Sequence, residues 1–269
     1  METAPGPWID ALRRSHDNLT ALVEPLDGDA VRRPSYDSEW TIAQVLSHLG
    51  SGAEIFDLFL TAGLTGEDPP GRDAFPPIWD TWNGRPPEAQ ATSALEADRR
   101  LLERFESLDP EQREGLHLDM FGMQLDTTGI ARMRLGEHAI HTWDIAVALD
   151  PAATVAPDSV ALLIGTLTQS AGRLAKTEGA EGRWLVTTTE PERHFTVEAG
   201  ESVTVVESTD ESGPDQDRPD QDPPELRLPA EALLRLVYGR LDPAHTPAVE
   251  SIGGGADELD RLRRIFPGF

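Results

Sequence analysis

The sequence predicts an α+β fold in which a helical bundle precedes a smaller α+β domain. Two observations carry this prediction. In the first half of the chain, apolar residues recur with the helical period in four long segments, 8–26, 42–61, 88–108 and 128–149. From residue 184 onward, apolar and polar residues alternate in short runs typical of antiparallel strands. We therefore expect two domains, 1–152 and 153–269.

Composition narrows the classes of protein to which the chain can belong. No run approaches the roughly 18 apolar residues that span a bilayer, and the N-terminus lacks the basic and apolar regions of a signal peptide, so we expect a cytoplasmic protein. The formal net charge of −25 would repel nucleic acid and anionic membranes, so we expect neither as a partner. The absence of cysteine excludes disulfides, thiolate ligands and a protein thiol nucleophile. Any sulfur chemistry would need a thiol from outside.

The helix expected from Ile42 to about Thr61 has a clear start. Thr41 followed by Gln44 forms a capping box, in which each side chain satisfies a backbone N–H at the beginning of the helix. Small and apolar residues surround His48 in helical projection, which favours a buried position for this imidazole. His16, on the apolar stripe of the first helix, is interpreted as a histidine at the edge of the core, with a metal ligand as the alternative.

Two further helices follow a long irregular stretch. Residues 63–87 are rich in proline and glycine, and we interpret them as a loop packed by Phe75, Trp79 and Trp82. The helix over 88–108 comes next, and the helix over 128–149 is closed by Asp150 and Pro151. With the two earlier helices these make a four-helix bundle, the kind of scaffold that builds metal sites from inward-facing side chains.

The helix over 128–149 carries metal-ligand residues in the middle of its apolar stripe. Glu137 and His141 are four residues apart and so lie one turn apart on one face. His138 points about 100° away, which disfavours it as a ligand. If His48 faces this pair, two imidazoles and a carboxylate could hold a divalent ion with open positions. The alternative is that Glu137 and His141 are a helix-surface pair.

The C-terminal half mixes strands and helices. The acidic, proline-containing segment 208–224 has no apolar residues and is predicted to be a disordered loop. We expect helices over 158–175, 230–241 and 256–266, and strands over 184–189, 194–198, 202–207 and 225–228.

Two motifs give the chain a family resemblance. Trp40-Thr41 followed by His48-Leu49, and the run from Glu137 to Asp144, resemble the mycothiol-dependent maleylpyruvate isomerase family, a branch of the DinB-like metal-binding bundles. A weaker match covers 228–240 and 266–268. The resemblance implies a DinB-like four-helix bundle followed by a sterol-carrier-like α+β domain, with a divalent metal bound by His48, Glu137 and His141.

The resemblance also implies a reaction class. Mycothiol would be the external thiol, and the enzyme would be a thiol-dependent cis–trans isomerase or a thiol S-transferase acting on a small electrophilic substrate. The ligand set favours zinc and also suits nickel, iron or manganese. A non-catalytic metal-binding or regulatory bundle and a metal-dependent hydrolase are the alternatives. We expect a monomer or a homodimer.

Three further residues each have more than one interpretation. Asp144, one turn beyond His141, could orient that imidazole, or it could cap the helix or pair with Arg132 or Arg134. Arg235 and Arg240 could bind the cofactor's polar groups or an anionic substrate, or could form surface ion pairs in this acidic protein.

Overall fold

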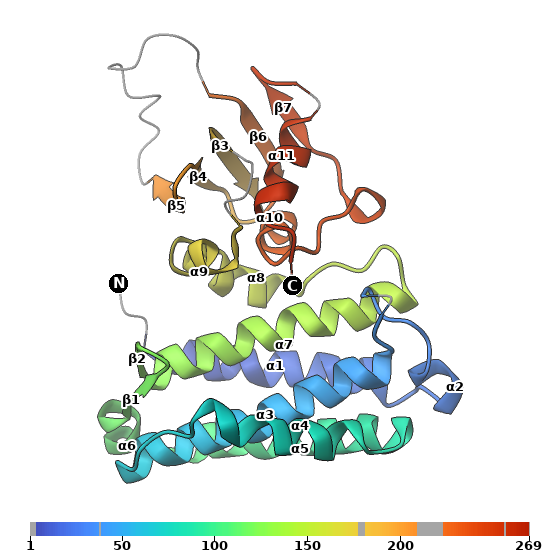
Figure 1. The fold of residues 1–269 in the computed structure, drawn as a ribbon, viewed down its shortest axis with the longest axis vertical. Coiled ribbons are helices and arrows are strands. Elements are labelled where there is room, and N and C mark those ends of the chain that lie inside the picture. Colours follow the sequence, from blue (N-terminus) through green and yellow to red (C-terminus); the bar gives the residue numbers. More distant parts are fainter. Residues whose placement is uncertain (1–3, 38, 177–180, 209–222, 256, 269) are drawn as a thin grey trace. The chain divides into compact units, whose positions relative to one another are not determined.

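The computed structural model describes residues 4–37, 39–176, 181–208, 223–255 and 257–268. The chain forms two compact units, Met1–Ser159 and Val160–Phe269 (Figure 1). The first is mainly helical and the second contains a five-stranded sheet, so the predicted fold class is confirmed. The domain boundary at residue 152 stays a prediction. The predicted disordered loop lies outside the described residues over 209–222.

Four long helices make the bundle of the first unit: α1 (Gly6–Val23), α3 (Ile42–Thr65), α5 (Pro87–Ser107) and α7 (Thr127–Leu149). The helices α1 and α3 each pack against both α5 and α7. Their apolar stripes meet in a core that includes the fully buried Leu19, Leu46 and Phe105, each contributing about 1.5–3 kcal/mol by leaving water. Within the described residues, no helix is long and apolar enough to cross a membrane.

The capping box predicted for α3 is confirmed. Thr41 Oγ1 accepts a hydrogen bond from the backbone N–H of Gln44 at 3.2 Å, and Gln44 Oε1 accepts one from the N–H of Thr41 at 2.9 Å. The helix ends at Gly66, whose φ of 71° is a left-handed conformation that glycine adopts without strain. This start fixes where along α3 the His48 side chain emerges.

The loop predicted over 63–87 is wrong for its second half. Residues 75–83 form the helix α4 (Phe75–Asn83), preceded by the short η1 (Arg72–Ala74). Pro76 and Pro77 stand in the first turn, where a missing N–H costs nothing, so prolines that suggest a loop are compatible with a helix start. Trp82 packs onto Gly50 of α3 so closely that a Cβ at Gly50 would lie 2.2 Å from the indole ring.

Small elements complete the first unit: α2 (Gly28–Val31), α6 (Pro110–Gly115) and a hairpin of β1 (His117–Met120) and β2 (Met123–Asp126). This hairpin is not among the elements expected from the sequence. Its turn places Phe121 at φ 56° and Gly122 at φ 88°. Positive φ is uncommon for phenylalanine, and a two-residue hairpin turn usually starts with Asn, Asp or Gly, so the turn has no recognisable sequence signal.

The second unit is built on a sheet of strand order β5-β4-β3-β6-β7. Its strands are β3 (Gly182–Thr189), β4 (Arg193–Ala199), β5 (Val203–Ser208), β6 (Glu225–Pro229) and β7 (Glu250–Ile252). All neighbours are antiparallel except β3 and β6, which are parallel. Alternate residues such as Trp184, Val186 and Phe195 face the core.

Helices of the second unit cover this sheet. The helix predicted over 158–175 is interrupted, as α8 (Pro157–Leu163), η2 (Ile164–Thr166) and α9 (Leu167–Leu174), and the last of these packs against β5. The helix α10 (Ala230–Val237) packs against β6 and β3 and is followed by η3 (Pro243–His245) and α11 (Glu258–Ile265).

The weaker C-terminal motif marks a close backbone contact. Gly239, at φ 71°, lies so near the C-terminal segment that a Cβ there would be 2.3 Å from the Gly268 backbone. Only glycine combines this conformation with this approach.

Candidate metal centre

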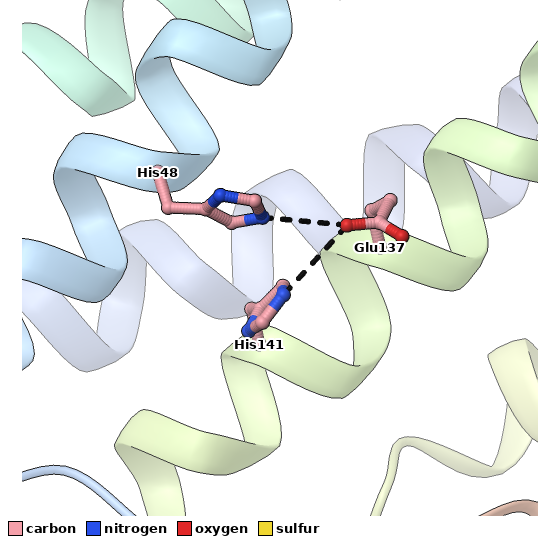
Figure 2. Close-up of side chains that lie close together, drawn as sticks. All are labelled: His48, Glu137 and His141. Carbon is pink, nitrogen blue, oxygen red and sulfur yellow. Dashed lines mark hydrogen bonds and ion pairs between the residues drawn. The ribbon is translucent and has the colours of Figure 1, made fainter. Parts of the chain in front are cut away.

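The two helices that carry the predicted ligands do face each other. His48 comes from α3, and Glu137 and His141 come from α7, with their side chains pointing toward one another (Figure 2). His48 Nε2 lies 3.3 Å from Glu137 Oε2, and His141 Nε2 lies 3.7 Å from the same oxygen. One ligand-type atom from each residue lies within 4.8 Å of the other two.

This donor set fits a divalent ion. Ligand atoms at the 2.0–2.1 Å typical of zinc–nitrogen and zinc–oxygen bonds are roughly 3.4 Å apart around a tetrahedral ion. The separations of 3.3 and 3.7 Å therefore lie close to coordination spacing. Two imidazole nitrogens and one carboxylate oxygen would leave at least one position open for a water, a thiol or a substrate oxygen.

The electrostatics of the cluster favour a negative carboxylate. Desolvation raises the pKa of Glu137, but hydrogen bonding and charge from His141 and His48 outweigh it and hold the pKa well below its ordinary value. Desolvation lowers the pKa of His141, but Asp144 and Glu137 outweigh that effect and raise it to about 9. The cluster combines a carboxylate that stays ionised with an imidazole that holds its proton firmly in the absence of a metal.

Asp144 lies where it can orient one of the imidazoles. Its buried carboxylate Oδ2 is 2.9 Å from His141 Nδ1, so the Nδ1–H can donate there and leave Nε2 facing the cluster. The backbone carbonyl of Asp144 accepts a hydrogen bond from the N–H of Tyr36 at 2.9 Å. This bond attaches the segment before α3 to α7 beside the cluster.

The cluster is accessible from solvent. The side chains of His48 and Glu137 are 35% and 45% exposed, whereas that of His141 is 14% exposed. The buried position expected for His48 is therefore wrong, because its imidazole lies at an open side of the bundle. Trp40 is half-exposed, and its ring centroid lies 5.6 Å from that of His48. A small molecule could therefore approach the open side of the cluster next to an indole.

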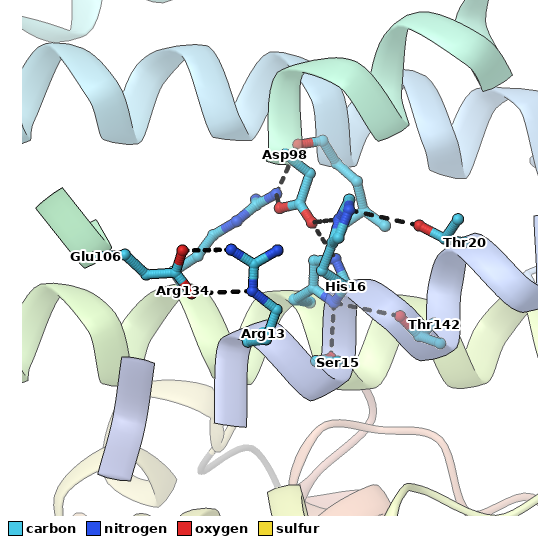
Figure 3. A network of polar contacts seen from close by, with 10 residues as sticks. Arg13, Ser15, His16, Thr20, Asp98, Glu106, Arg134 and Thr142 are labelled. Carbon is cyan, nitrogen blue, oxygen red and sulfur yellow. Dashed lines mark hydrogen bonds and ion pairs between the residues drawn. The ribbon is translucent and has the colours of Figure 1, made fainter. Parts of the chain in front are cut away.

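A buried polar network lies next to the cluster and includes Arg134 and His138 of α7 (Figure 3). The carboxylate of Asp98, on α5, contacts Arg134 at 2.7 Å, His138 at 2.9 Å and His16 at 2.8 Å. His138 is also 2.7 Å from Ser15, so it belongs to this network and not to the cluster. The network was not expected from the sequence, although one signal for it is present: Asp98 occupies an apolar-face position of its helix, four residues after the buried Ala94.

The two arginines predicted to bind a cofactor make different contacts. Arg235 is buried and forms a bidentate ion pair with Glu231 at 2.7 and 2.8 Å, and it also donates to the carbonyl of His245 at 2.9 Å. Arg240 is half-buried and donates to the carbonyl of Tyr238 at 2.9 Å. The contacts of Arg235 are those of a structural ion pair, and the cofactor-binding role of both arginines stays a prediction.

Two hollows in the first unit do not involve the cluster. One of about 410 Å³ lies between α1, α2 and α5 with His16 in its wall, and one of about 550 Å³ lies between α3 and α5. Their linings include several carboxylates, but none of the described groups in them forms a metal-type cluster like that on α3 and α7.

The family model and the solved structures that match this chain all concern mycothiol-dependent maleylpyruvate isomerases. Residues 12–146 match the family model described as the mycothiol maleylpyruvate isomerase N-terminal domain. The crystal structure of the mycothiol-dependent maleylpyruvate isomerase has a similar fold, with a TM-score of 0.68 and 15% sequence identity over 95% of this chain and 98% of that chain. The crystal structure of a histidine-to-alanine mutant of the mycothiol-dependent maleylpyruvate isomerase gives the same values. No curated protein matches in sequence.

Proposed function

Because the chain belongs to the mycothiol maleylpyruvate isomerase family, we propose that it is a metal-dependent enzyme that uses mycothiol to transform a small electrophilic substrate. The resemblance inferred from the motifs is thereby confirmed. The reaction subclass, the metal and the roles of individual residues are part of the proposal. A cytoplasmic location is part of it as well.

One observation carries the proposal most directly. Ligand-type atoms of His48, Glu137 and His141, from two helices far apart in the sequence, lie within 4.8 Å of one another on an accessible face. If Glu137 and His141 were only a surface pair on α7, there would be no reason for His48 of α3 to lie beside them. The convergence therefore supports a metal site over the alternative of a surface pair.

The chemistry expected at such a site fits a chain without cysteine. A bound divalent ion would lower the pKa of a coordinated thiol and so supply a thiolate at neutral pH. A substrate whose conjugated double bond gains the sulfur, rotates about the resulting single bond and loses the sulfur again leaves as its geometric isomer. A substrate that keeps the carbon–sulfur bond leaves as a thioether. These outcomes define the isomerase and the transferase.

The residues of the chain would have separate tasks in this proposal. His48, Glu137 and His141 would hold the ion, and Asp144 would hold the Nδ1 proton of His141 so that Nε2 remains a donor. Trp40 would form an apolar wall beside the open positions.

The test is metal content and thiol-dependent turnover of the purified chain. Metal-loaded protein is incubated with mycothiol and maleylpyruvate, and then with a panel of small electrophiles, and the products are identified by mass spectrometry. We expect turnover that requires both the metal and the thiol. Metal-loaded protein that transforms no electrophile with mycothiol, but cleaves esters or amides without it, would favour the hydrolase.

Matched variants separate the cluster from other histidines. His48→Ala should lose metal and turnover together, because a three-residue donor set loses one ligand. His117→Ala changes an exposed histidine of β1 and should keep both. If His48→Ala retained the full metal content, the ligand assignment would be wrong.

A further inference from the structure

We propose that Arg134 is a positioning residue that sets the spacing between α3 and α7 and thereby brings His48 within reach of Glu137 and His141. This inference rests on the proposed function, since it assumes that the cluster binds a metal. It concerns a residue outside the cluster, one helical turn before Glu137.

Arg134 connects directly to the backbone of the opposite ligand-bearing helix. Its Nη2 donates to the carbonyl oxygen of Leu49 at 3.1 Å, and Leu49 immediately follows His48 on α3. The side chain of Arg134 is 2% exposed, so water does not compete for this bond. This hydrogen bond therefore joins α7 to α3 beside the cluster, through a side chain that is buried.

Asp98 holds the guanidinium in place from a third helix. Its Oδ1 accepts from the same Nη2 at 2.7 Å, and its Oδ2 contacts His138 and His16 (Figure 3). A buried arginine requires a charged partner, and one carboxylate on α5 provides it. Contacts with α1, α5 and α7 therefore fix the position of the guanidinium independently of its hydrogen bond to α3.

The packing around Arg134 matches this role. Gly52, one turn beyond His48 on α3, faces the guanidinium, and a Cβ there would lie 3.1 Å from Nη1. Next to the cluster in the α3–α7 interface, Gly52 of α3 thus lies opposite Arg134 of α7. Because α3 has no side chain at this position, the guanidinium determines how closely the two helices approach.

Spacing matters for a site whose ligands come from two helices. His48 Nε2 lies 3.3 Å from Glu137 Oε2, and bonds of about 2.0–2.1 Å tolerate little extra separation. A shift of α3 away from α7 moves His48 away from both other donors at once. Glu137 and His141 share α7, so their separation is unaffected.

The experiment measures Co²⁺ binding, not turnover. The dissociation constant and the visible absorption spectrum of the Co²⁺ complex are measured for the wild type, Arg134→Met and Arg134→Lys, together with the free energy of unfolding of each metal-free protein. The control is Arg13→Met. It removes a bidentate ion pair with Glu106 that joins α1 to α5, two helices that carry no ligand of the cluster.

We expect Arg134→Met to weaken Co²⁺ binding by about 10- to 100-fold, the range typical of groups that hold metal ligands in place, and to change the absorption spectrum. Arg134→Lys keeps the charge beside Asp98 but has a shorter side chain, so its affinity should lie between. Arg13→Met should keep the wild-type affinity and spectrum even where it loses stability.

Two results have separate meanings. If the folded Arg134 variants bind Co²⁺ with the wild-type dissociation constant and spectrum, Arg134 only stabilises the bundle and the inference is overturned. If Arg134→Met does not fold, Arg134→Lys decides in the same way. A wild-type protein that binds no Co²⁺ would instead overturn the proposed function, and the positioning role with it.

Discussion

Metal binding at the cluster should compete with a proton on His141. The pKa of about 9 means that the metal-free imidazole is protonated at pH 7, whereas a metal-bound imidazole must be neutral. Displacing a proton whose pKa lies about two units above the pH weakens binding about 100-fold, or about 2.7 kcal/mol. We therefore expect the apparent Kd for Zn²⁺ to fall about tenfold per pH unit between pH 7 and pH 9, and to level off above that range.

Chelator competition across pH 6.5–9.5 measures this slope, and calorimetry in two buffers of different ionisation enthalpy counts the protons released. Asp144→Asn is the matched variant, because the hydrogen bond and charge of Asp144 help to raise the pKa of His141. In this variant the affinity should level off at a lower pH. An affinity that is flat between pH 7 and pH 9, or an unchanged profile in the variant, would refute the reasoning.

Three further predictions concern stability. Gly50→Ala places a carbon 2.2 Å from the Trp82 ring, and overpacking of about 1–3 kcal/mol should exceed the gain of under about 1 kcal/mol from alanine in a helix. Chemical denaturation should therefore show a clear loss that Gly115→Ala, whose Cβ would meet no atom within 4 Å, does not share. Burial raises the pKa of Asp98, but its basic partners hold it well below the ordinary value, so its stabilising effect is present above about pH 4 and is lost as the pH falls further. Unfolding curves from pH 3 to pH 7 should show a shallower acid slope for Asp98→Asn than for the wild type. Arg235→Met should lower the stability by up to about 3 kcal/mol, because it removes the buried partner of the largely buried Glu231 carboxylate. Mycothiol affinity lost without any change in thermal stability would instead support a cofactor contact.

Much of the first unit was predictable because its signals are local. The capping box at Thr41 and Gln44 determines the first residue of α3, and the spacing of Glu137 and His141 places both on one face of α7. No local feature of the sequence predicts that α3 and α7 pack together. That expectation came from the resemblance of the two motifs to a known family. The structure adds the distances that such a resemblance lacks.

Other features escaped because they depend on distant partners. The parallel pairing of β3 with β6 joins residues 40 positions apart, such as Leu185 and Glu225, and alternation of side chains does not indicate which strands become neighbours. The proline-rich segment that begins α4 has the composition of a loop, and its packing through Trp82 onto the distant Gly50 cannot be read from that composition. Asp98 looks like an interruption of an apolar stripe until three basic partners from α1 and α7 are placed around it.

Because three basic residues share the carboxylate of Asp98, substitutions in this network depend on one another. Arg134, His138 and His16 all depend on Asp98, so replacing the acid by a neutral residue leaves a cation enclosed without a counter-charge. A single substitution at any of the four positions is therefore harder to accept than a joint one. Across related sequences, the four residues should therefore be kept together or exchanged together for an apolar set.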